Sequence, residues 1–138
     1  MTKINTLEIK ISTVQKYLRT LKKYQGCSVD ELENNEQLRG FIERYLYLAA
    51  QSTIDLAEAF LSFKNFRRPT SLSDNFYILN EEEIIAPELV EKLIQMTGFR
   101  NILAHDYLKI DYKRVCDILK NDLKDIEKFV AIIAEKIK

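Results

Sequence analysis

The residues best suited to chemistry in this sequence lie close together, between positions 100 and 107. Arg100 can hold a phosphate through two parallel charge-assisted hydrogen bonds, and His105 is a histidine, the residue type that most often moves protons in catalysis. Asn101 and Tyr107 add two further polar groups to the same stretch. An arginine and a histidine together can cleave a phosphodiester by attack of the ribose 2′-hydroxyl. The histidine then moves the proton, and the arginine stabilises the developing negative charge without a metal ion.

The geometry of a helix limits how these groups can meet. At about 100° per residue, Asn101 and His105 share one face, whereas Arg100 and His105 diverge by about 140°. Either the helix loosens near His105, or a second protomer contributes the missing groups. Proton transfer also favours both an acid and a base, and a chain with a single histidine obtains a second one most simply by dimerising. The sequence therefore predicts a homodimer with a shared cleft.

Residue counts exclude several other kinds of catalytic site. Because His105 is the one histidine, the chain cannot build a zinc site from two or three imidazoles. Cys27 and Cys116 lie in unrelated stretches and make no convincing set of metal ligands. The 3 glycines are scattered, so a glycine-rich phosphate loop is absent as well. We expect no metal and no cofactor.

The cellular compartment follows from similar arguments. No charged leader precedes an apolar run, and no apolar stretch approaches the ~20 residues needed to cross a bilayer. We expect a cytoplasmic protein that does not enter the membrane, with Cys27 and Cys116 reduced. A disulfide between these two cysteines stays open, because sequence spacing does not exclude it.

The length of the chain is that of one domain, and its net charge gives no overall attraction for polyanions. The 138 residues suffice for a single domain spanning 1–138, and 21 basic residues balance 21 acidic ones. Contacts with a nucleic-acid backbone would therefore need a local basic patch. The candidates for such contacts are Arg67, Arg68, Lys109 and Lys113, with Arg114 nearby.

The elements that must position these residues are helices, since 3 glycines and 2 prolines provide few turns. Apolar residues from Ile4 to Leu21 follow steps of three and four, which predicts a long helix that ends near Gly26 in the left-handed conformation. A short helical turn over 29–34, capped by Ser28 or Asp30, should lead into a central helix from about Asn35 to Phe63. The spacing predicts that the residues before Pro69 stop that helix.

The second half of the chain predicts three further helices. A modest helix is expected after the caps in 71–74, continuing through Glu81–Glu83 to Ile85. The next begins at Pro87 and carries the Arg100–Tyr107 stretch at its end. A last helix follows Asp111 as its cap. The predicted architecture is all-α, an antiparallel bundle of four to five helices.

Each candidate residue also has a plain structural interpretation. A histidine at a helix end is more often a hydrogen-bonded structural residue than a catalyst. Arg100 alone would be a surface charge and Tyr107 a core aromatic with a hydrated hydroxyl. Arg67 and Arg68 would belong to a solvated helix end. These alternatives stay open on spacing alone.

The stretch from Arg100 to Tyr107 resembles the HEPN superfamily of helical ribonucleases, and more narrowly the HepT toxins. It has the pattern arginine, a polar residue, three further residues, histidine, any residue, tyrosine. The chain length, the place of the stretch on the penultimate long helix and the segment 39–61, with Glu43-Arg44-Tyr45, also fit the family. The resemblance spans nearly the whole chain.

The resemblance implies a homodimeric, metal-independent endoribonuclease that damages RNA, including tRNA. Carried over by position, Arg100 would orient or stabilise the scissile phosphate, His105 would move the proton, and Asn101 would position either group. The implied partner is a minimal nucleotidyltransferase antitoxin that transfers AMP from ATP onto Tyr107. The added phosphate and bulk would then block RNA entry.

Two other interpretations of the chain remain. It could be a non-catalytic helical subunit that docks a nucleotidyltransferase and binds a nucleotide or phosphate without cutting RNA. It could also be a purely structural bundle, in which changes at Arg100 and His105 would affect stability alone. Asp106, between His105 and Tyr107, could raise the pKa of the histidine or repel the substrate, depending on where it points.

Overall fold

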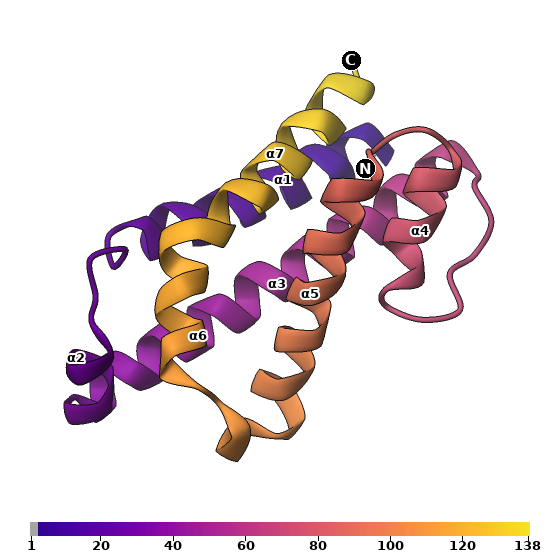
Figure 1. Ribbon diagram of the computed structural model, residues 1–138. Helices are drawn as coiled ribbons and strands as arrows, with labels where there is room; N and C mark the ends of the chain where they lie inside the picture. The colour runs from indigo at the N-terminus through magenta and orange to yellow at the C-terminus, as the bar shows by residue number, and fades with distance from the viewer. Residues whose placement is uncertain (1–2) are drawn as a thin grey trace.

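The computed structural model describes residues 3–138, with the side chain of Tyr107 excepted, and this part is helical throughout with no β-strand (Figure 1). Four long helical segments form its body: α1 (Lys3–Lys22), α3 (Glu36–Lys64), α5 (Pro87–His105) and a final segment of α6 (Tyr112–Asp117), η2 (Ile118–Asp122) and α7 (Leu123–Lys136). Three short elements, α2 (Val29–Asn34), α4 (Asp74–Glu81) and η1 (Tyr107–Lys109), lie between them. The all-α helical bundle is confirmed.

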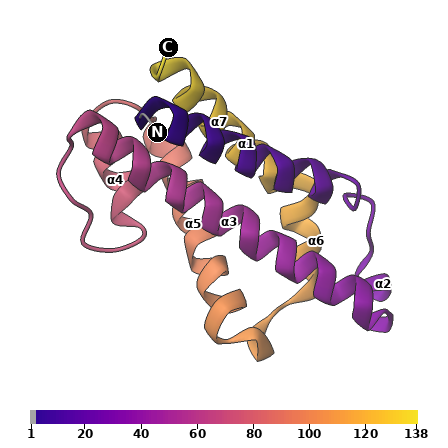
Figure 2. The same ribbon diagram turned by 180° about the vertical axis from the view of Figure 1, so that it is seen from behind.

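The core lies where α1 and α7 pack over α3 and α5. Figures 1 and 2 show α1 running along α3 and next to α7, while α5 crosses α3. The apolar stripe predicted for the first helix faces inward, and these members are buried: Leu7, Ile11, Val14, Leu18 and Leu21. Buried aromatic rings from different elements meet in this core: Phe76 of α4 and Phe129 of α7 have a centroid distance of 5.7 Å. Burying such a surface is the main stabilising contribution to the bundle.

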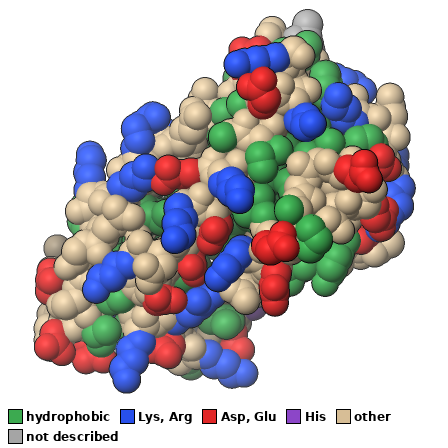
Figure 3. Space-filling view, turned by 45° about the horizontal axis from the view of Figure 1, so that its top comes forward, with side chains coloured by type: hydrophobic (Ala, Val, Ile, Leu, Met, Phe, Trp, Pro, Cys, Tyr) green, Lys and Arg blue, Asp and Glu red, His purple; other side chains and the backbone are tan. Residues whose placement is uncertain are grey.

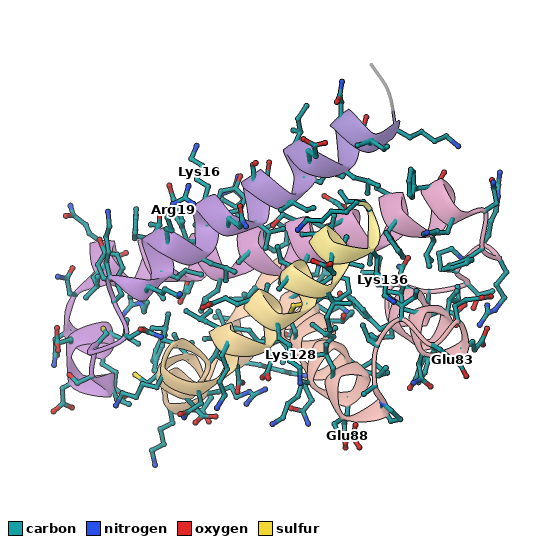
Figure 4. All side chains as sticks on the ribbon, turned by 90° about the horizontal axis from the view of Figure 1, so that it is seen from above. Lys16, Arg19, Glu83, Glu88, Lys128 and Lys136 are labelled. Atoms are coloured by element: carbon teal, nitrogen blue, oxygen red, sulfur yellow. The ribbon has the colours of Figure 1, made fainter. Side chains whose placement is uncertain are left out.

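Charged side chains point away from this core. Seen from above in Figure 4, Lys16 and Arg19 extend outward from α1, and Lys128 and Lys136 extend from α7. In Figure 3, basic and acidic side chains alternate over the visible face with apolar patches between them. This mixture agrees with the balanced composition and shows no dominant basic surface on that face.

The ends of the first three helices follow local sequence signals, with one correction. Ser28 and Glu31 form the reciprocal capping box that starts α2, as predicted for a cap at this position. Gly26, however, does not adopt the left-handed conformation that we expected. The chain leaves α1 through successive turns in which an N–H bonds to the carbonyl three residues earlier. The side chain of Gln25 also donates a hydrogen bond to the carbonyl of Leu119 at 2.9 Å.

The central helix α3 ends at Lys64, close to the predicted end near Phe63, but the residue that stops it is Asn65 rather than Pro69. Asn65 takes the left-handed conformation, with φ 57°, and its N–H bonds to the carbonyls of Leu61 and Ser62. Phe66 then donates its N–H to Leu61 at 3.0 Å and packs its ring against Phe60. This pattern of bonds closes a helix locally, so the end of α3 is determined by Asn65.

The helix predicted to run on to Ile85 is shorter in the structure. α4 ends at Glu81, because Glu83 has a positive φ of 59° that interrupts the helix. The side chain of Asn80 instead bonds to the carbonyl of Ile85 at 3.0 Å and closes the loop before Pro87. Pro87 lies in the first turn of α5 as predicted.

The final helix contains one irregularity that the sequence did not predict. Asp111 caps α6 through a hydrogen bond from the N–H of Lys113, as expected. A π-helical turn over η2 then joins α6 to α7. Cys27 and Cys116 are buried and free, so the disulfide considered above is not formed. Among the described residues, no helix is long and apolar enough to cross a membrane.

This arrangement separates two ends of the molecule. α4 and the loop before it lie beside the start of α5, whereas η1 lies beyond the other end of α5 (Figures 1 and 2). The Arg100–His105 stretch therefore belongs to the end of the bundle opposite α4. The facing helix at that end is the first half of α3.

Candidate active site

The helix α5 ends at His105, which places the histidine at a helix terminus. Asp106, the next residue, has φ −147° and ψ 42°, outside the helical region, and its N–H bonds to the carbonyl of Ile102 at 2.9 Å. His105 and Asn101 are exposed, and Arg100 is half-buried. The helix therefore does not continue past His105, in agreement with the expectation that it loosens near this residue.

Among the described residues, the guanidinium of Arg100 is hydrogen-bonded to three neutral side chains. Its Nε donates to Gln51 Oε1 at 2.8 Å, and one terminal nitrogen donates to Asn101 Oδ1 at 2.9 Å. The other terminal nitrogen donates to the Tyr47 hydroxyl at 3.4 Å, with the guanidinium carbon 5.3 Å from the centroid of the Tyr47 ring. Within the described part of the chain, no carboxylate forms an ion pair with Arg100. Its positive charge therefore remains available for an anion.

The amide of Gln51 is oriented in turn by Asp55. Gln51 donates from Nε2 to Asp55 Oδ1 at 2.9 Å, which leaves its carbonyl oxygen to face Arg100. All three side chains are partly buried between α3 and α5. Asp55 is thus linked to Arg100 through Gln51 and does not contact the guanidinium directly. Its hydrogen bond holds the Gln51 amide in the orientation that faces Arg100.

An open groove of about 440 Å³ between α3 and α5 brings Arg100 and His105 together. Its lining comes from both helices: Gly40, Glu43, Arg44 and Tyr47 of α3, and Arg100, Leu103, Ala104 and His105 of α5. The angular divergence computed for an isolated helix does not keep the two residues apart. Arg100 is long enough to reach α3, and His105 is on the last turn of α5.

The acidic side chain in the groove, Glu43, contacts Tyr112 of α6. Its carboxylate accepts a hydrogen bond from the Tyr112 hydroxyl at 3.5 Å, and Arg39 lies over the Tyr112 ring. Burial raises the pKa of Glu43, although Arg39 and the Tyr112 hydroxyl lower it in part. Glu43 therefore carries a proton more readily than an exposed glutamate does.

The proposed basic contacts do not gather at this groove. Arg67 is at the end of α3 next to α4, where it pairs with Asp74 at 2.9 Å and Glu81 at 2.7 Å. Arg68 is exposed in the same loop. Lys109 pairs with Asp106 at 3.2 Å and borders a separate hollow between α5 and α6 that Arg114 also lines.

The two remaining residues of interest lie beyond the end of α5. Lys113 is exposed on α6. Tyr107 begins η1, and its side chain lies outside the part that the structure describes. The carboxylate of Asp106, whose direction the sequence left open, forms an ion pair with Lys109.

Sequence reasoning missed the contribution of α3. Most of the missed residues follow one another at intervals of four or three along α3, namely Gly40, Arg44, Tyr47, Gln51 and Asp55, with Glu43 adjacent to Arg44. That repeat places them on one helical face. A polar stripe on a helix with buried residues on its other sides is a signal that would have found them. Among the described residues, no group of three or more His, Cys, Asp or Glu side chains could hold a metal ion.

Comparison with known proteins decides the family. A family model described as "Ribonuclease HepT-like" matches residues 14–133. The chain belongs to the HepT-like ribonuclease family. The resemblance noted from the Arg100–Tyr107 stretch is thereby confirmed, together with the prediction of a ribonuclease.

Two curated proteins are similar to this HepT-like chain over most of its length. The "tRNA nuclease HepT" of Aphanizomenon flos-aquae is 29% identical over 109 residues, covering 79% of this chain and 74% of the relative. The "mRNA nuclease HepT" of Shewanella oneidensis is 25% identical over 124 residues, covering 90% of this chain and 92% of the relative.

A solved structure shares the fold. The tri-AMPylated HEPN toxin of Shewanella oneidensis, in complex with its MNT antitoxin, superimposes with a TM-score of 0.86 at 24% identity, covering 98% of this chain and 99% of the toxin. At this identity the likeness concerns the fold. It shows that the arrangement of α1, α3, α5 and α7 in the HepT-like chain is that of a HEPN toxin.

Proposed function

We propose that this HepT-like protein is the toxin of a toxin–antitoxin pair and that it cleaves RNA in the groove between α3 and α5. The observation that carries this proposal is the guanidinium of Arg100, which has neutral hydrogen-bond partners, forms no ion pair among the described residues, and lines the same groove as His105. A phosphate is the anion for which such a planar donor group is best suited. Family membership and the nuclease relatives support RNA as the substrate.

The proposed reaction uses the ribose 2′-hydroxyl as the nucleophile. His105 accepts its proton while a new bond forms between O2′ and phosphorus, and the bond from phosphorus to O5′ breaks as O5′ takes a proton from a second imidazole, the protonated His105 of a second copy of the chain. The products are a 2′,3′-cyclic phosphate and a 5′-hydroxyl. Arg100 stabilises the charge that develops on the non-bridging oxygens, and Asn101 holds Arg100 from its own helix. The protein groups supply each of these steps without a metal ion.

A second acid–base group would come from a second copy of the chain. Because each protomer has one histidine, a homodimer with facing motifs supplies two. Leu108, which follows the motif, is 88% exposed, which leaves an apolar side chain at this end of the molecule for a second copy to cover. This observation supports a dimer whose interface includes the η1 end of the molecule.

The proposed partner is a minimal nucleotidyltransferase antitoxin that transfers AMP to Tyr107. The HEPN toxin of Shewanella oneidensis, described as tri-AMPylated and in complex with MNT antitoxin, supports this partner. Tyr107 begins η1, two residues after His105, the last residue of α5. An added phosphate near Arg100 would compete with RNA for the guanidinium. The site of action we propose is the cytoplasm, where both RNA and such a partner are found.

Purified, unmodified protein tests the nuclease activity directly. We expect it to cleave tRNA or mRNA in EDTA, whereas His105→Ala, with its fold verified by circular dichroism, does not. Absence of cleavage by the unmodified protein across several RNA pools would contradict the proposal and favour a non-catalytic phosphate-binding subunit.

Intact mass tests the regulation. Incubation with ATP and an MNT-type antitoxin should add one or more AMP units to the wild-type chain. The Tyr107→Phe variant should gain no AMP at position 107. The modified protein should no longer cleave RNA. Modification that leaves cleavage unchanged would contradict the proposed inhibition.

A further inference from the structure

Arg44 is a second arginine of the α3–α5 groove that has no assigned role. It is exposed on α3, and its guanidinium carbon lies 6.0 Å from the centroid of the Tyr47 ring. The guanidinium of Arg100 lies 5.3 Å from the same centroid. Two cations from two different helices are therefore held against one aromatic ring in one groove.

Neither cation is compensated by an ion pair in the described part of the chain. Arg67 and Arg114, in contrast, each contact two carboxylates within 4 Å. The carboxylate of Glu43, next to Arg44 in sequence, is directed at the Tyr112 hydroxyl. Two like charges so close repel each other, and a single ring offsets only part of this cost. The arrangement is stabilised when anions enter the groove.

We propose that Arg44 binds the phosphate next to the scissile phosphate of the RNA. The inference rests on the proposed function, because it assigns the scissile phosphate to Arg100. Single-stranded RNA presents its phosphates one nucleotide apart, and the guanidinium carbons of Arg44 and Arg100 lie 6.0 and 5.3 Å from the same ring centroid in one groove, which brings both within reach of neighbouring phosphates. The Tyr47 hydroxyl accepts a hydrogen bond from Arg100, which ties the ring to that guanidinium.

This second phosphate subsite has a kinetic consequence that differs from that of Arg100. The phosphate beside the scissile one does not change its charge during the reaction, so Arg44 binds the ground state and the transition state alike. Loss of Arg44 therefore raises KM more than it lowers kcat. Each phosphate contact also contributes about 0.7 to the slope of log K against log salt for a single strand.

Short substrates with defined phosphates test the subsite. One is a dinucleoside monophosphate, and two are trinucleoside diphosphates in which a 2′-O-methyl group leaves only one linkage open to cleavage. The extra phosphate then lies on the 5′ side in one trinucleotide and on the 3′ side in the other. For the wild type we expect the kcat/KM of one trinucleotide to exceed that of the dinucleotide by about tenfold.

In Arg44→Ala this advantage should fall to about one, and Arg44→Lys should restore part of it because the charge returns. Arg19→Ala is the matched control, since Arg19 is an exposed arginine of α1 outside the groove and without an ion pair in the described residues. It should keep the full advantage of the trinucleotide. If Arg44→Ala lowers kcat/KM for the dinucleotide and both trinucleotides by the same factor, or for none of them, the subsite is wrong.

Binding separates this proposal from the nuclease activity. Fully 2′-O-methylated di- and trinucleotides cannot react, so their affinities report the subsite even if the wild type cleaves no RNA. Tighter binding of the trinucleotide by the wild type but not by Arg44→Ala would then support the subsite although the nuclease function had failed. Equal affinities for both lengths in the wild type would overturn it.

Discussion

At the scale of single residues, the site depends on which side chains surround Arg100 rather than on the arginine itself. The chain is rich in acidic residues, yet Gln51, Asn101 and Tyr47 occupy the hydrogen-bonding positions. A carboxylate at any of them would neutralise the guanidinium and reduce its affinity for phosphate. The neutral partners hold the group in place and preserve its charge, which is the requirement for electrostatic stabilisation by a fixed donor.

Gln51 tests this interpretation, because Glu is nearly isosteric with it. In Gln51→Glu the guanidinium gains an ion pair and the bond to Asp55 is lost, and we expect RNA affinity to fall because the charge of Arg100 is neutralised. In Gln51→Leu the Nε contact is lost, and we expect kcat to fall by roughly tenfold because Arg100 is no longer held in one orientation. Single-turnover cleavage at saturating and subsaturating RNA separates the two effects.

Gln25→Leu provides the comparison for these variants. Gln25 also bridges two elements through one hydrogen bond, to the carbonyl of Leu119, but it lies outside the groove. It should lower stability by about 1 kcal/mol and leave cleavage unchanged. If Gln51→Glu and Gln51→Leu behave like Gln25→Leu in cleavage and differ only in stability, Gln51 does not position Arg100.

The sequence predicted the residues of α5 in this site but not those of α3. Arg100 and His105 were recognisable because five positions separate them and their types suit one reaction. Gln51 and Tyr47 lie 49 and 53 residues from Arg100 in sequence. Contacts over such a separation depend on how α3 and α5 cross, which local periodicity does not determine. Arg67 was misleading for the same reason, since its partners Asp74 and Glu81 come from another helix.

At the scale of helices, the ends are governed by individual residues in unusual conformations. Asn65 ends α3 with φ 57°, a region in which a Cβ atom is costly and which asparagine tolerates better than most residues. We expect Asn65→Ala to lower the free energy of unfolding by about 1 kcal/mol, whereas Asn65→Gly does not lower it. Urea denaturation followed by circular dichroism measures both. Equal stability of Asn65→Ala and the wild type would show that this conformation does not limit the end of α3.

The loop after α3 should make stability depend on pH. Hydrogen bonds from Arg67, followed by the N–H of Thr70, lower the pKa of Asp74 to about 2. A carboxyl with a lowered pKa in the folded state stabilises the protein above its unfolded pKa of about 4, and this contribution is lost as the pH falls toward 2. The stability difference between wild type and Asp74→Asn should therefore be largest at pH 7 and shrink at pH 3.

Thermal unfolding at pH 7, 5 and 3 measures that difference. Because Asp74 anchors the start of α4 next to Arg67, the effect reports on the end of the bundle away from the groove. RNA cleavage at pH 7 should be affected little by Asp74→Asn. A stability difference that stays constant from pH 7 to pH 3 would contradict the assignment of the low pKa to Asp74.

Helix boundaries were predicted well where a cap is encoded next to the helix. Ser28 and Asp111 gave correct starts because their side chains bond to backbone N–H groups two or three residues away. Gly26 and Glu83 gave errors. The turn at Gly26 is held by a tertiary hydrogen bond from Gln25, and the positive φ of Glu83 has no sequence signature for a residue of this type.

At the scale of the whole molecule, the exposed end near η1 predicts self-association. Leu108 makes little contact with its own chain, so Leu108→Glu should not disturb the monomer fold. We expect the wild type to sediment as a dimer, at about twice the chain mass of 16.2 kDa, and Leu108→Glu to shift toward the monomer. Cleavage should fall in parallel with the dimer fraction.

Ile9→Glu serves as the control for this experiment. Ile9 is also an exposed apolar side chain, 52% accessible, but it lies on α1 and does not line the groove. It should sediment like the wild type. A wild-type chain that remains monomeric at micromolar concentration and still cleaves RNA would contradict the shared cleft.

The central claim is that one groove, through Arg100 and His105, cleaves RNA by attack of the 2′-hydroxyl. The most direct test is to incubate a defined RNA with the unmodified protein in EDTA and to determine the new ends by mass spectrometry. We predict 2′,3′-cyclic phosphate and 5′-hydroxyl ends, and single-turnover rates about 10²- to 10³-fold lower in Arg100→Ala, with His105→Ala lower still. Ends bearing a 3′-hydroxyl and a 5′-phosphate, or wild-type rates in Arg100→Ala, would contradict the claim.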